Sequence, residues 1–339
     1  MCSFMKTVGL TYDLKTDYEF KAGDPPDANA EFDHPSTIDV IAQAIEKCGF
    51  KVKKIGNVNH LLEKIDKLGV DIVFNISEGI FGRNRESQVP VLLEMADIPF
   101  VGADALTSGL TLDKVIAKKI FIAEGIPTPK FFEVKTVDSL VNADHLKFPL
   151  IVKPRFEGSS KGLTDNSRVA NKDELKKQVE YVINTYKQPA LIEEFISGQE
   201  FTVAIVGNDS PEVMPIVQIK IDGRLKLNDK FYTFARITSD RLEYICPARI
   251  NKDLKKKISN LALKSYNAVE CRDFGRVDFR VDKEGRPYVL EINPLPSLST
   301  EDVFMVVAKE VGISYEEMIG KILNSALKRY NFPAERDPA

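Results

Sequence analysis

Apolar and polar positions follow two different periods in the first third of the chain. Short apolar runs predict β-strands, whereas apolar residues three and four positions apart predict helices that bury one face. These patterns occur in the order strand 6–10, helix 36–48, strand 51–55, helix 58–68, strand 70–76, helix 90–96, strand 98–101 and helix 113–124. Strands that alternate with helices in this way predict a parallel, Rossmann-like sheet.

The pattern changes after Pro127, where long polar connections join the strands. Strands are predicted at 130–134, 150–153, 190–195, 201–206 and 213–221, and helices at 173–186, 252–268 and 315–330. A chain of 339 residues is long enough for two or three domains. We therefore expect a Rossmann-like domain over 1–113, α+β units over 114–200 and 201–331, and a polar tail over 332–339.

The segment 275–293 predicts a hairpin with polar side chains gathered on one face. Counting outward from its central turn places Asp278 opposite Glu291, and Arg276 opposite Asn293. Strand alternation then puts these four residues on one face. The other face takes the apolar residues Val277, Phe279, Val281, Tyr288, Leu290 and Ile292.

Two carboxylates that face each other across a β-ladder destabilise it unless a positive charge lies near them. A hard divalent cation with oxygen ligands, most simply Mg²⁺, would supply that charge and could bridge to a phosphate. The alternative interpretation is a wetted hairpin whose arginines, Arg276 and Arg280, neutralise the acids. The hairpin alone leaves both interpretations open.

The strand Ile151–Pro154 runs into a loop of small residues that suits a phosphate. Gly158, Ser159 and Ser160 allow backbone N–H groups to approach an anion, and Lys153 can neutralise it. The sequence lacks both GxxxxGK[ST] and GxGxxG, so this is neither a Walker A loop nor a dinucleotide fingerprint. An exposed hairpin turn is the alternative.

A second strand, 190–196, is broken at Ser197-Gly198 and followed by the acid Glu200. Backbone groups at such a break can bind adenine, and a nearby carboxylate can accept hydrogen bonds from both ribose hydroxyls. Taken alone, the segment is also compatible with an ordinary strand that ends in an acid.

Composition argues against several classes of function. Lys+Arg 47 against Asp+Glu 50 gives a net charge of -3, so nucleic acid and anionic membranes are not expected partners. Four scattered cysteines and three histidines make a thiolate or imidazole metal site improbable. No apolar run of about 18 residues occurs, so we expect a cytoplasmic protein that does not span a membrane.

The order of these segments resembles the ATP-grasp superfamily, and within it the D-alanine:D-alanine ligases. The resemblance runs from about Asp71 to Leu327 and is strongest in five segments. They are Leu112-Asp113-Lys114, Ile151–Pro154 with Glu157–Ser160, Glu193–Glu200, Gly275–Asp278 and Leu290–Asn293. It implies an ATP-grasp fold, in which a Rossmann-like domain precedes two α+β subdomains that clasp ATP. A homodimer is compatible with the family.

The resemblance also implies roles for individual residues. Lys114 and Lys153 would contact ATP phosphates beneath a lid that contains Gly158 and Ser160. Glu193, Phe195 and Ile196 would surround adenine, Glu200 would hold the ribose, and Asp278, Glu291 and Asn293 would coordinate two Mg²⁺ ions. Arg276 and the Ser297 N–H would stabilise the tetrahedral intermediate, Ser159 would orient substrate, and Arg236 would lie in a closing loop.

Family members phosphorylate a carboxylate with ATP and let an amine attack the acylphosphate. The substrate end of this chain departs from the family. The family's early ammonium-binding glutamate is missing from 9–14, where Asp13 could substitute, and its His-Gly segment becomes Glu78-Gly79 followed by Arg83 and Arg85. These arginines could indicate a substrate with an additional carboxylate.

The acid Asp302 aligns with a serine that would bind the second substrate's carboxylate. Two negative groups would repel there, so we expect a ligase for small-molecule substrates other than two D-alanines. A divergent D-alanine:D-alanine ligase is the alternative. A small-molecule kinase and a nucleotide-binding regulatory module are alternatives of other classes.

Overall fold

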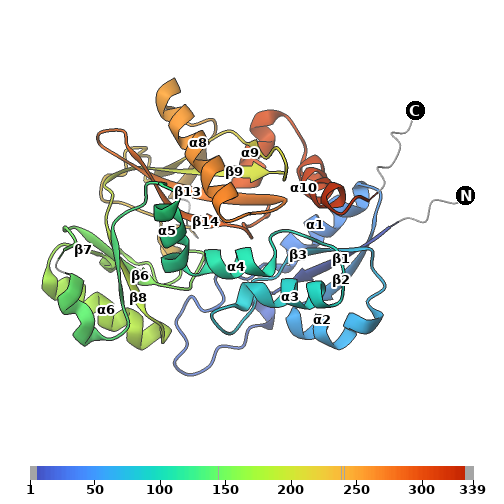
Figure 1. Ribbon diagram of the computed structural model, residues 1–339, viewed down its shortest axis with the longest axis horizontal. Coiled ribbons are helices and arrows are strands. Elements are labelled where there is room, and N and C mark those ends of the chain that lie inside the picture. The colour runs from blue at the N-terminus through green and yellow to red at the C-terminus, as the bar shows by residue number, and fades with distance from the viewer. Residues whose placement is uncertain (1–5, 144, 238, 240, 333–339) are drawn as a thin grey trace, which may run out of the picture.

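The computed structural model describes residues 6–143, 145–237, 239 and 241–332, which form three sheets (Figure 1). The predicted tail at 332–339 lies outside the described residues apart from Phe332. Within the described part, no helix is long and apolar enough to cross a membrane. The predicted domain limit near 113 falls between two helices, and the limit near 200 falls just inside a strand. Both limits stay predictions.

The first sheet is parallel, as the alternating pattern predicts. Its strands are β1 (Thr7–Tyr12), β2 (Lys51–Gly56), β3 (Ile72–Ile76) and β4 (Phe100–Val101), in the order β2-β1-β3-β4. Its helices are α1 (Pro35–Lys47), α2 (Val58–Lys64), α3 (Gln88–Met95) and α4 (Ala105–Leu112). The last helix, α10 (Tyr315–Arg329), returns to pack beside α1 (Figure 1).

The second sheet is antiparallel and has the order β5-β8-β6-β7. It contains β5 (Phe131–Val134), β6 (Leu150–Pro154), β7 (Arg168–Val169) and β8 (Ala190–Glu194). α6 (Lys172–Tyr186) packs against this sheet, whereas α5 (Lys114–Ala123) packs against elements of the third sheet. Short 3₁₀ helices occur at Lys15–Asp17, Ile65–Lys67, Arg85–Ser87, Val137–Ala143 and Asp165–Ser167.

The third sheet has the order β12-β11-β9-β13-β14, with β10 paired to β9. It contains β9 (Gly198–Val206), β10 (Glu212–Val213), β11 (Val217–Ile221), β12 (Leu242–Ile245), β13 (Phe274–Asp282) and β14 (Pro287–Asn293). Its helices are α7 (Phe234–Ile237), α8 (Lys252–Ala268) and α9 (Val303–Val311). The predicted strand 213–221 is therefore two strands, and the segment 222–244, which follows it, contains α7 and the start of β12.

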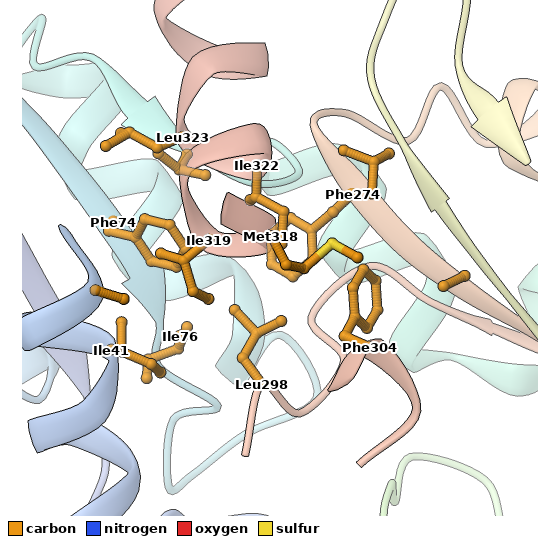
Figure 2. Close-up of a cluster of buried hydrophobic side chains, with 14 of the residues drawn as sticks. Ile41, Phe74, Ile76, Phe274, Leu298, Phe304, Met318, Ile319, Ile322 and Leu323 are labelled. Carbon is orange, nitrogen blue, oxygen red and sulfur yellow. The ribbon is translucent and has the colours of Figure 1, made fainter. Parts of the chain in front are cut away.

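One hydrophobic core joins the first sheet to the C-terminal elements. Phe74 of β3, Phe274 of β13, Phe304 of α9 and Met318 of α10 are fully or almost fully buried in it (Figure 2). The Phe274 ring lies 5.9 Å from that of Phe304 in an edge-on arrangement. The first sheet is consequently packed against the third sheet, which fixes the position of the hairpin beside it.

The predicted hairpin register is confirmed at its outer end, where Arg276 pairs with Asn293 and Asp278 with Glu291. The register then shifts, because Phe279 pairs with Val289 and leaves Leu290 as the extra residue of a β-bulge. Val289 is fully buried in the core, whereas Tyr288 and Leu290 are half-buried. The predicted placement of Tyr288 and Leu290 on the core face was wrong, since counting from the turn could not include the bulge.

Candidate active site

A cavity of about 690 Å³ lies where the three sheets meet. Each part of the chain lines it: Glu31 and Glu78 come from the N-terminal domain, Lys153 from the second sheet, and Asp278 and Glu291 from the third. Residues that are distant in sequence therefore line one cavity, and most of the predicted site residues are among them.

The polar face of the hairpin forms one wall of this cavity. Arg276 holds Asp278 with two hydrogen bonds, from Nε at 3.1 Å and from Nη2 at 3.0 Å. Asn293 Nδ2 donates to Asp278 Oδ2 at 2.9 Å, and Lys114 Nζ lies 3.1 Å from Glu291 Oε2. The two facing acids are thus compensated by one lysine and one arginine.

The chemistry of this donor set suits a hard cation, because two carboxylates and an amide supply oxygen ligands. No cluster of three or more His, Cys, Asp or Glu residues occurs among the described residues, so these acids would share the ion with other oxygens. Burial raises the pKa of Asp278. Although burial also acts on Glu291, the ammonium groups of Lys114 and Lys153 lower the pKa of Glu291 to about 2. Glu291 is therefore ionised and available as a ligand at neutral pH.

The two predicted phosphate lysines both reach the cavity. Lys114 Nζ donates to the Glu157 carbonyl at 2.6 Å, at the start of the lid. Lys153 Nζ lies 3.0 Å from Glu193, whose other oxygen lies 2.8 Å from Lys118 Nζ. Sequence reasoning missed Lys118, which is fully buried one helical turn after Lys114. The sequence signal that could have identified Lys118 is its place in a largely apolar helix, four positions after Lys114 and therefore on the same face.

The lid itself adopts an unusual backbone conformation. Ser159 and Ser160 have φ angles of 44° and 56°, in the left-handed region that non-glycine residues rarely occupy. A segment that we call the strap, residues 15–34, packs against this lid. Asp27 of the strap accepts a hydrogen bond from Gly162 N–H at 2.8 Å, and Glu31 accepts one from Gly158 N–H. The loop that contains Gly158 and Gly162 is therefore hydrogen-bonded to side chains of the strap.

The predicted adenine and ribose residues line the same cavity. Glu193, Phe195, Ile196 and Glu200 all contribute to its wall. Arg280 connects two of them, because its Nη1 lies 2.8 Å from Glu200 and its Nε donates to the Ile196 carbonyl at 2.6 Å. Burial raises the pKa of Glu200 to about 7 despite this arginine.

The predicted substrate residues divide into two groups. Glu78, Ser297 and Asp302 line the cavity, whereas Asp13, Arg83 and Arg85 do not. Asp13 is buried, and it accepts hydrogen bonds from Ser77 Oγ at 2.8 Å and Gly79 N–H at 2.9 Å. The structure therefore gives Asp13 a local structural contact rather than a place in the cavity.

The two arginines are occupied by protein groups. Arg83 is 57% exposed, pairs with Asp113 at 2.7 Å, and lines a separate hollow between α2, α3 and α4. Arg85 is buried, lies 2.7 Å from Glu31 and donates to the Phe156 carbonyl at 2.7 Å. Neither arginine lines the cavity, so the reason for expecting an additional substrate carboxylate is lost.

The predicted catalytic groups occupy different positions. Ser159 and Arg276 line the cavity. Arg236 lies outside its wall, where Nη2 pairs with Asp165 at 2.6 Å and Nη1 donates to the Phe231 carbonyl at 3.0 Å. Through these contacts, Arg236 connects the segment 222–244 to the part of the chain that forms the second sheet.

Sequence comparisons agree with this geometry. A family profile described as D-ala D-ala ligase C-terminus matches residues 120–324. A D-alanine–D-alanine ligase from Carboxydothermus hydrogenoformans is 36% identical over 304 residues, which are 86% of this chain and 93% of that protein. The chain belongs to the D-alanine–D-alanine ligase family.

Other proteins that are similar to this chain are an uncharacterized protein, y4sG, from Sinorhizobium fredii, and two ligases of known structure. The y4sG protein is 35% identical over 300 residues, covering 86% of this chain and 88% of that protein. A Bacillus anthracis D-alanine–D-alanine ligase complexed with ATP has a TM-score of 0.75 at 25% identity, covering 96% of this chain and 99% of that one. The VanG D-Ala:D-Ser ligase from Enterococcus faecalis, at 22% identity and TM-score 0.71, shows the fold alone, over 95% and 99% of the two chains.

The predicted ATP-grasp fold is thereby confirmed. The protein is an ATP-binding, ADP-forming carbon–nitrogen ligase of the D-alanine–D-alanine ligase family, and it acts on small molecules. The likeness fixes the reaction class and leaves the two substrates to be argued from this chain's own residues.

A further acid of this ligase, Asp33, was not predicted as a site residue. Its side chain lines the cavity, and burial raises its pKa to about 7, with Lys15 opposing and Asp13 and Asp302 adding to the rise. In the folded protein the Asp33 carboxyl group stays protonated up to about pH 7, whereas in the unfolded chain it loses its proton near pH 4. Folding therefore takes up this proton between those pH values.

We expect the Asp33→Asn variant to lose part of the pH dependence of stability. In the natural protein, Asp33 stabilises the fold below about pH 4, and this contribution is lost as the pH rises to about 7. The difference in unfolding free energy between the variant and the natural protein should change by at most about 1.4 kcal/mol per pH unit. Urea unfolding of both ligand-free proteins at pH 4, 5, 6, 7 and 8 measures it, and parallel curves would contradict the assignment.

Proposed function

We propose that this ligase activates the carboxylate of a small molecule, an amino acid, as an acylphosphate and joins it to an amine other than D-alanine. The observation that carries this proposal is Asp302, a carboxylate in the cavity wall where the family's carboxylate-binding serine aligns. Arg276 is held by two hydrogen bonds to Asp278 and makes no direct ion pair with Asp302 among the described residues, although the charge of Asp302 also acts on the guanidinium. A second substrate with its own carboxylate would be repelled at this position.

The proposed reaction has two steps. A carboxylate oxygen of the first substrate attacks the γ-phosphorus of ATP, the bond to the bridging oxygen breaks, and ADP leaves. The nitrogen of the amine then attacks the acyl carbon, the bond to the phosphate oxygen breaks, phosphate leaves, and the nitrogen releases a proton. Phosphoryl transfer of this kind depends mainly on positioning and on compensation of charge at the phosphate oxygens.

The cavity residues supply those requirements in this proposal. Lys114 and Lys153 neutralise phosphate charge, the lid backbone at Ser159 and Ser160 offers N–H donors, and Glu200 receives the ribose hydroxyls. Arg276 and the Ser297 N–H stabilise the oxyanion of the tetrahedral intermediate. Asp278, Glu291 and Asn293 would hold Mg²⁺, which would add positive charge beside the β- and γ-phosphates.

A panel assay tests the proposal. The purified ligase is given ATP, Mg²⁺ and pairs of amino acids, carboxylic acids and amines, and ADP, free phosphate and product mass are measured. We expect free phosphate and an amide-type product from a pair that differs from two D-alanines. Phosphate that stays on the acceptor would indicate a kinase instead.

The second candidate is D-alanyl-D-alanine synthesis, which is favoured by the 36% identity to a protein of that name. Phosphate release stimulated most strongly by D-alanine alone, with the dipeptide as product, would establish it. The homodimer and the cytoplasmic location stay predictions, and light scattering in solution tests the first.

We expect Asp302→Ser to improve the use of an amine that carries a carboxylate, such as D-alanine. The substitution removes the repelling charge, and serine can still cap α9, where Asp302 now accepts a hydrogen bond from Val303 N–H at 2.6 Å. The ratio of kcat/KM for D-alanine to that for the best natural amine should rise by about tenfold or more, equivalent to about 1.4 kcal/mol. Asp302→Asn separates charge from size, and an unchanged ratio in both variants would contradict the role of Asp302.

A further inference from the structure

One arginine of the hairpin, Arg280, is hydrogen-bonded to three segments beside the cavity. Its Nε donates to the Ile196 carbonyl at 2.6 Å, and its Nη1 donates to Glu200 Oε2 at 2.8 Å. Nη1 also donates to the Lys230 carbonyl, and Nη2 donates to the Asn228 carbonyl, both at 3.0 Å. A single guanidinium group therefore uses most of its N–H donors on protein acceptors.

The position of Arg280 follows from strand pairing. Arg280 comes two residues after Asp278 on β13, so alternation places both side chains on the face that lines the cavity. In the ladder between β13 and β9, Arg280 is paired with Glu200. Arg280 is only 3% exposed, and its guanidinium lies 4.7 Å from the centre of the Phe195 ring. Strand register, burial and an aromatic face together hold the cation in place.

Two partners of Arg280 belong to the nucleotide placement proposed above. The backbone at Ile196 would lie beside adenine, and Glu200 would receive the ribose hydroxyls. Arg280 contacts Glu200 through Oε2, and a carboxylate can accept hydrogen bonds from further donors at either oxygen. One guanidinium thus fixes the adenine side and the ribose side of the site relative to each other.

The other two partners belong to the connection between β11 and α7. Asn228 N–H donates to the Gly198 carbonyl at 2.9 Å, and Gly198 N–H donates to the Asn228 carbonyl at 3.2 Å. Phe231, a little further along, lines the cavity and packs edge-on against Phe195 with ring centres 5.6 Å apart. Arg280 therefore stands at the centre of a network that joins this connection to the nucleotide side of the cavity.

We infer that Arg280 is a positioning residue for the nucleotide, which holds the Glu200 carboxylate in the orientation that receives the ribose hydroxyls. The inference rests on the nucleotide placement of the proposed function. Arginine suits this role because its planar fork fixes several acceptors at once, whereas a lysine ammonium is a point charge. A purely structural cation would be different, because its loss would weaken the binding of every adenine nucleotide by the same factor.

The charges around Glu200 agree with this geometry. Burial raises the pKa of Glu200, Arg280 lowers it, and the Asp278 and Glu291 carboxylates raise it again. The charge of Glu200 also acts on Tyr232. Arg280 therefore acts against two neighbouring acids and favours the carboxylate form, which accepts two hydroxyl donors.

The test compares nucleotides that differ by one ribose hydroxyl. Calorimetry without a carboxylate or amine substrate measures the Kd of ATP, 2′-deoxy-ATP and 3′-deoxy-ATP with Mg²⁺ at pH 8, above the pKa of about 7 for Glu200. With the natural enzyme we expect at least one deoxynucleotide to bind about tenfold more weakly than ATP, because a hydrogen bond to a charged group is lost. Equal affinity for the three nucleotides would overturn the inference without any variant.

Variants then assign the role to Arg280. Arg280→Met keeps an apolar stem against Phe195 but removes every donor, and we expect the ratio of the deoxynucleotide Kd to the ATP Kd to fall to about threefold or less. Arg280→Lys keeps the charge with one nitrogen and is the milder variant should methionine disturb folding; the ratio should fall in it too. The control is Arg286→Met in the turn of the same hairpin, where the side chain is 64% exposed and the ratio should stay unchanged. An unchanged ratio in the folded Arg280 variants would overturn the inference.

A double variant shows whether Arg280 acts through Glu200. Glu200→Gln should itself reduce the ratio, and adding Arg280→Met to it should change the ratio no further. A second fall of the same size in the double variant would show that Arg280 acts independently of Glu200, and the positioning role would be wrong.

The two proposals fail in different ways. If no nucleotide binds to the folded enzyme, both the proposed function and this inference fall. If ATP binds with a preference for the ribose hydroxyls but no substrate pair yields a ligase product, only the proposed function falls. If product forms and the ribose hydroxyls make no difference to Kd, only the role of Arg280 falls.

Discussion

The Glu291→Gln enzyme is expected to lose nearly all ATP-dependent turnover while it keeps its fold. Glu291 is ionised beside Lys114 and faces Asp278 across the hairpin. Glutamine preserves the shape and one hydrogen-bonding oxygen but removes the charge that would hold a divalent cation beside the phosphates. We expect kcat to fall by about 10²–10³-fold or more, the size seen when a group that stabilises transition-state charge is removed.

The measurement is ADP formation at saturating ATP and Mg²⁺ with the best substrate pair. Glu284→Gln is the control, because Glu284 lies in the turn of the same hairpin, is 64% exposed and pairs only with Arg286 among the described residues. Its kcat should match that of the natural enzyme. A Glu291→Gln enzyme with kcat within threefold of the natural one would show that the hairpin acids do not take part in catalysis.

The largest expected loss of stability comes from Asp273→Asn. Asp273 is fully buried and lies 2.6 Å from Arg329 of α10, and it accepts hydrogen bonds from Gly102 N–H at 2.8 Å and Asn208 Nδ2 at 2.9 Å. It thus joins the first sheet, the third sheet and the last helix. Asparagine tolerates the positive φ of 63° at this position, so backbone strain does not confuse the result.

Removing the charge leaves Arg329 partly buried without its counterion, which costs about 3–5 kcal/mol. Urea unfolding measures the change, with Asp66→Asn at an exposed position as a control that should stay within about 0.5 kcal/mol. The double variant Asp273→Asn with Arg329→Met should be less destabilised than the sum of the single variants. Strict additivity would indicate that the ion pair contributes little.

Much of the fold was accessible from the sequence because its signals are local. The parallel first sheet follows from apolar runs that alternate with amphipathic segments, and the pairing of Asp278 with Glu291 follows from counting along one hairpin. The errors have equally specific causes. One extra residue, Leu290, reverses the faces beyond it, and the short strands β10 and β12 are defined by their partners more than by their own sequence.

The sequence by itself determined the order of elements and the hairpin register near the acids, and it named most of the lysines and acids that the structure gathers around one cavity. It could do so because strand and helix periods are set by neighbouring residues. Only the tertiary structure decided that Arg85 pairs with Glu31, that Lys118 pairs with Glu193, and that Glu86 lines the cavity. Those contacts join segments far apart in the chain, and no local pattern records which charged side chain a packed neighbour will neutralise.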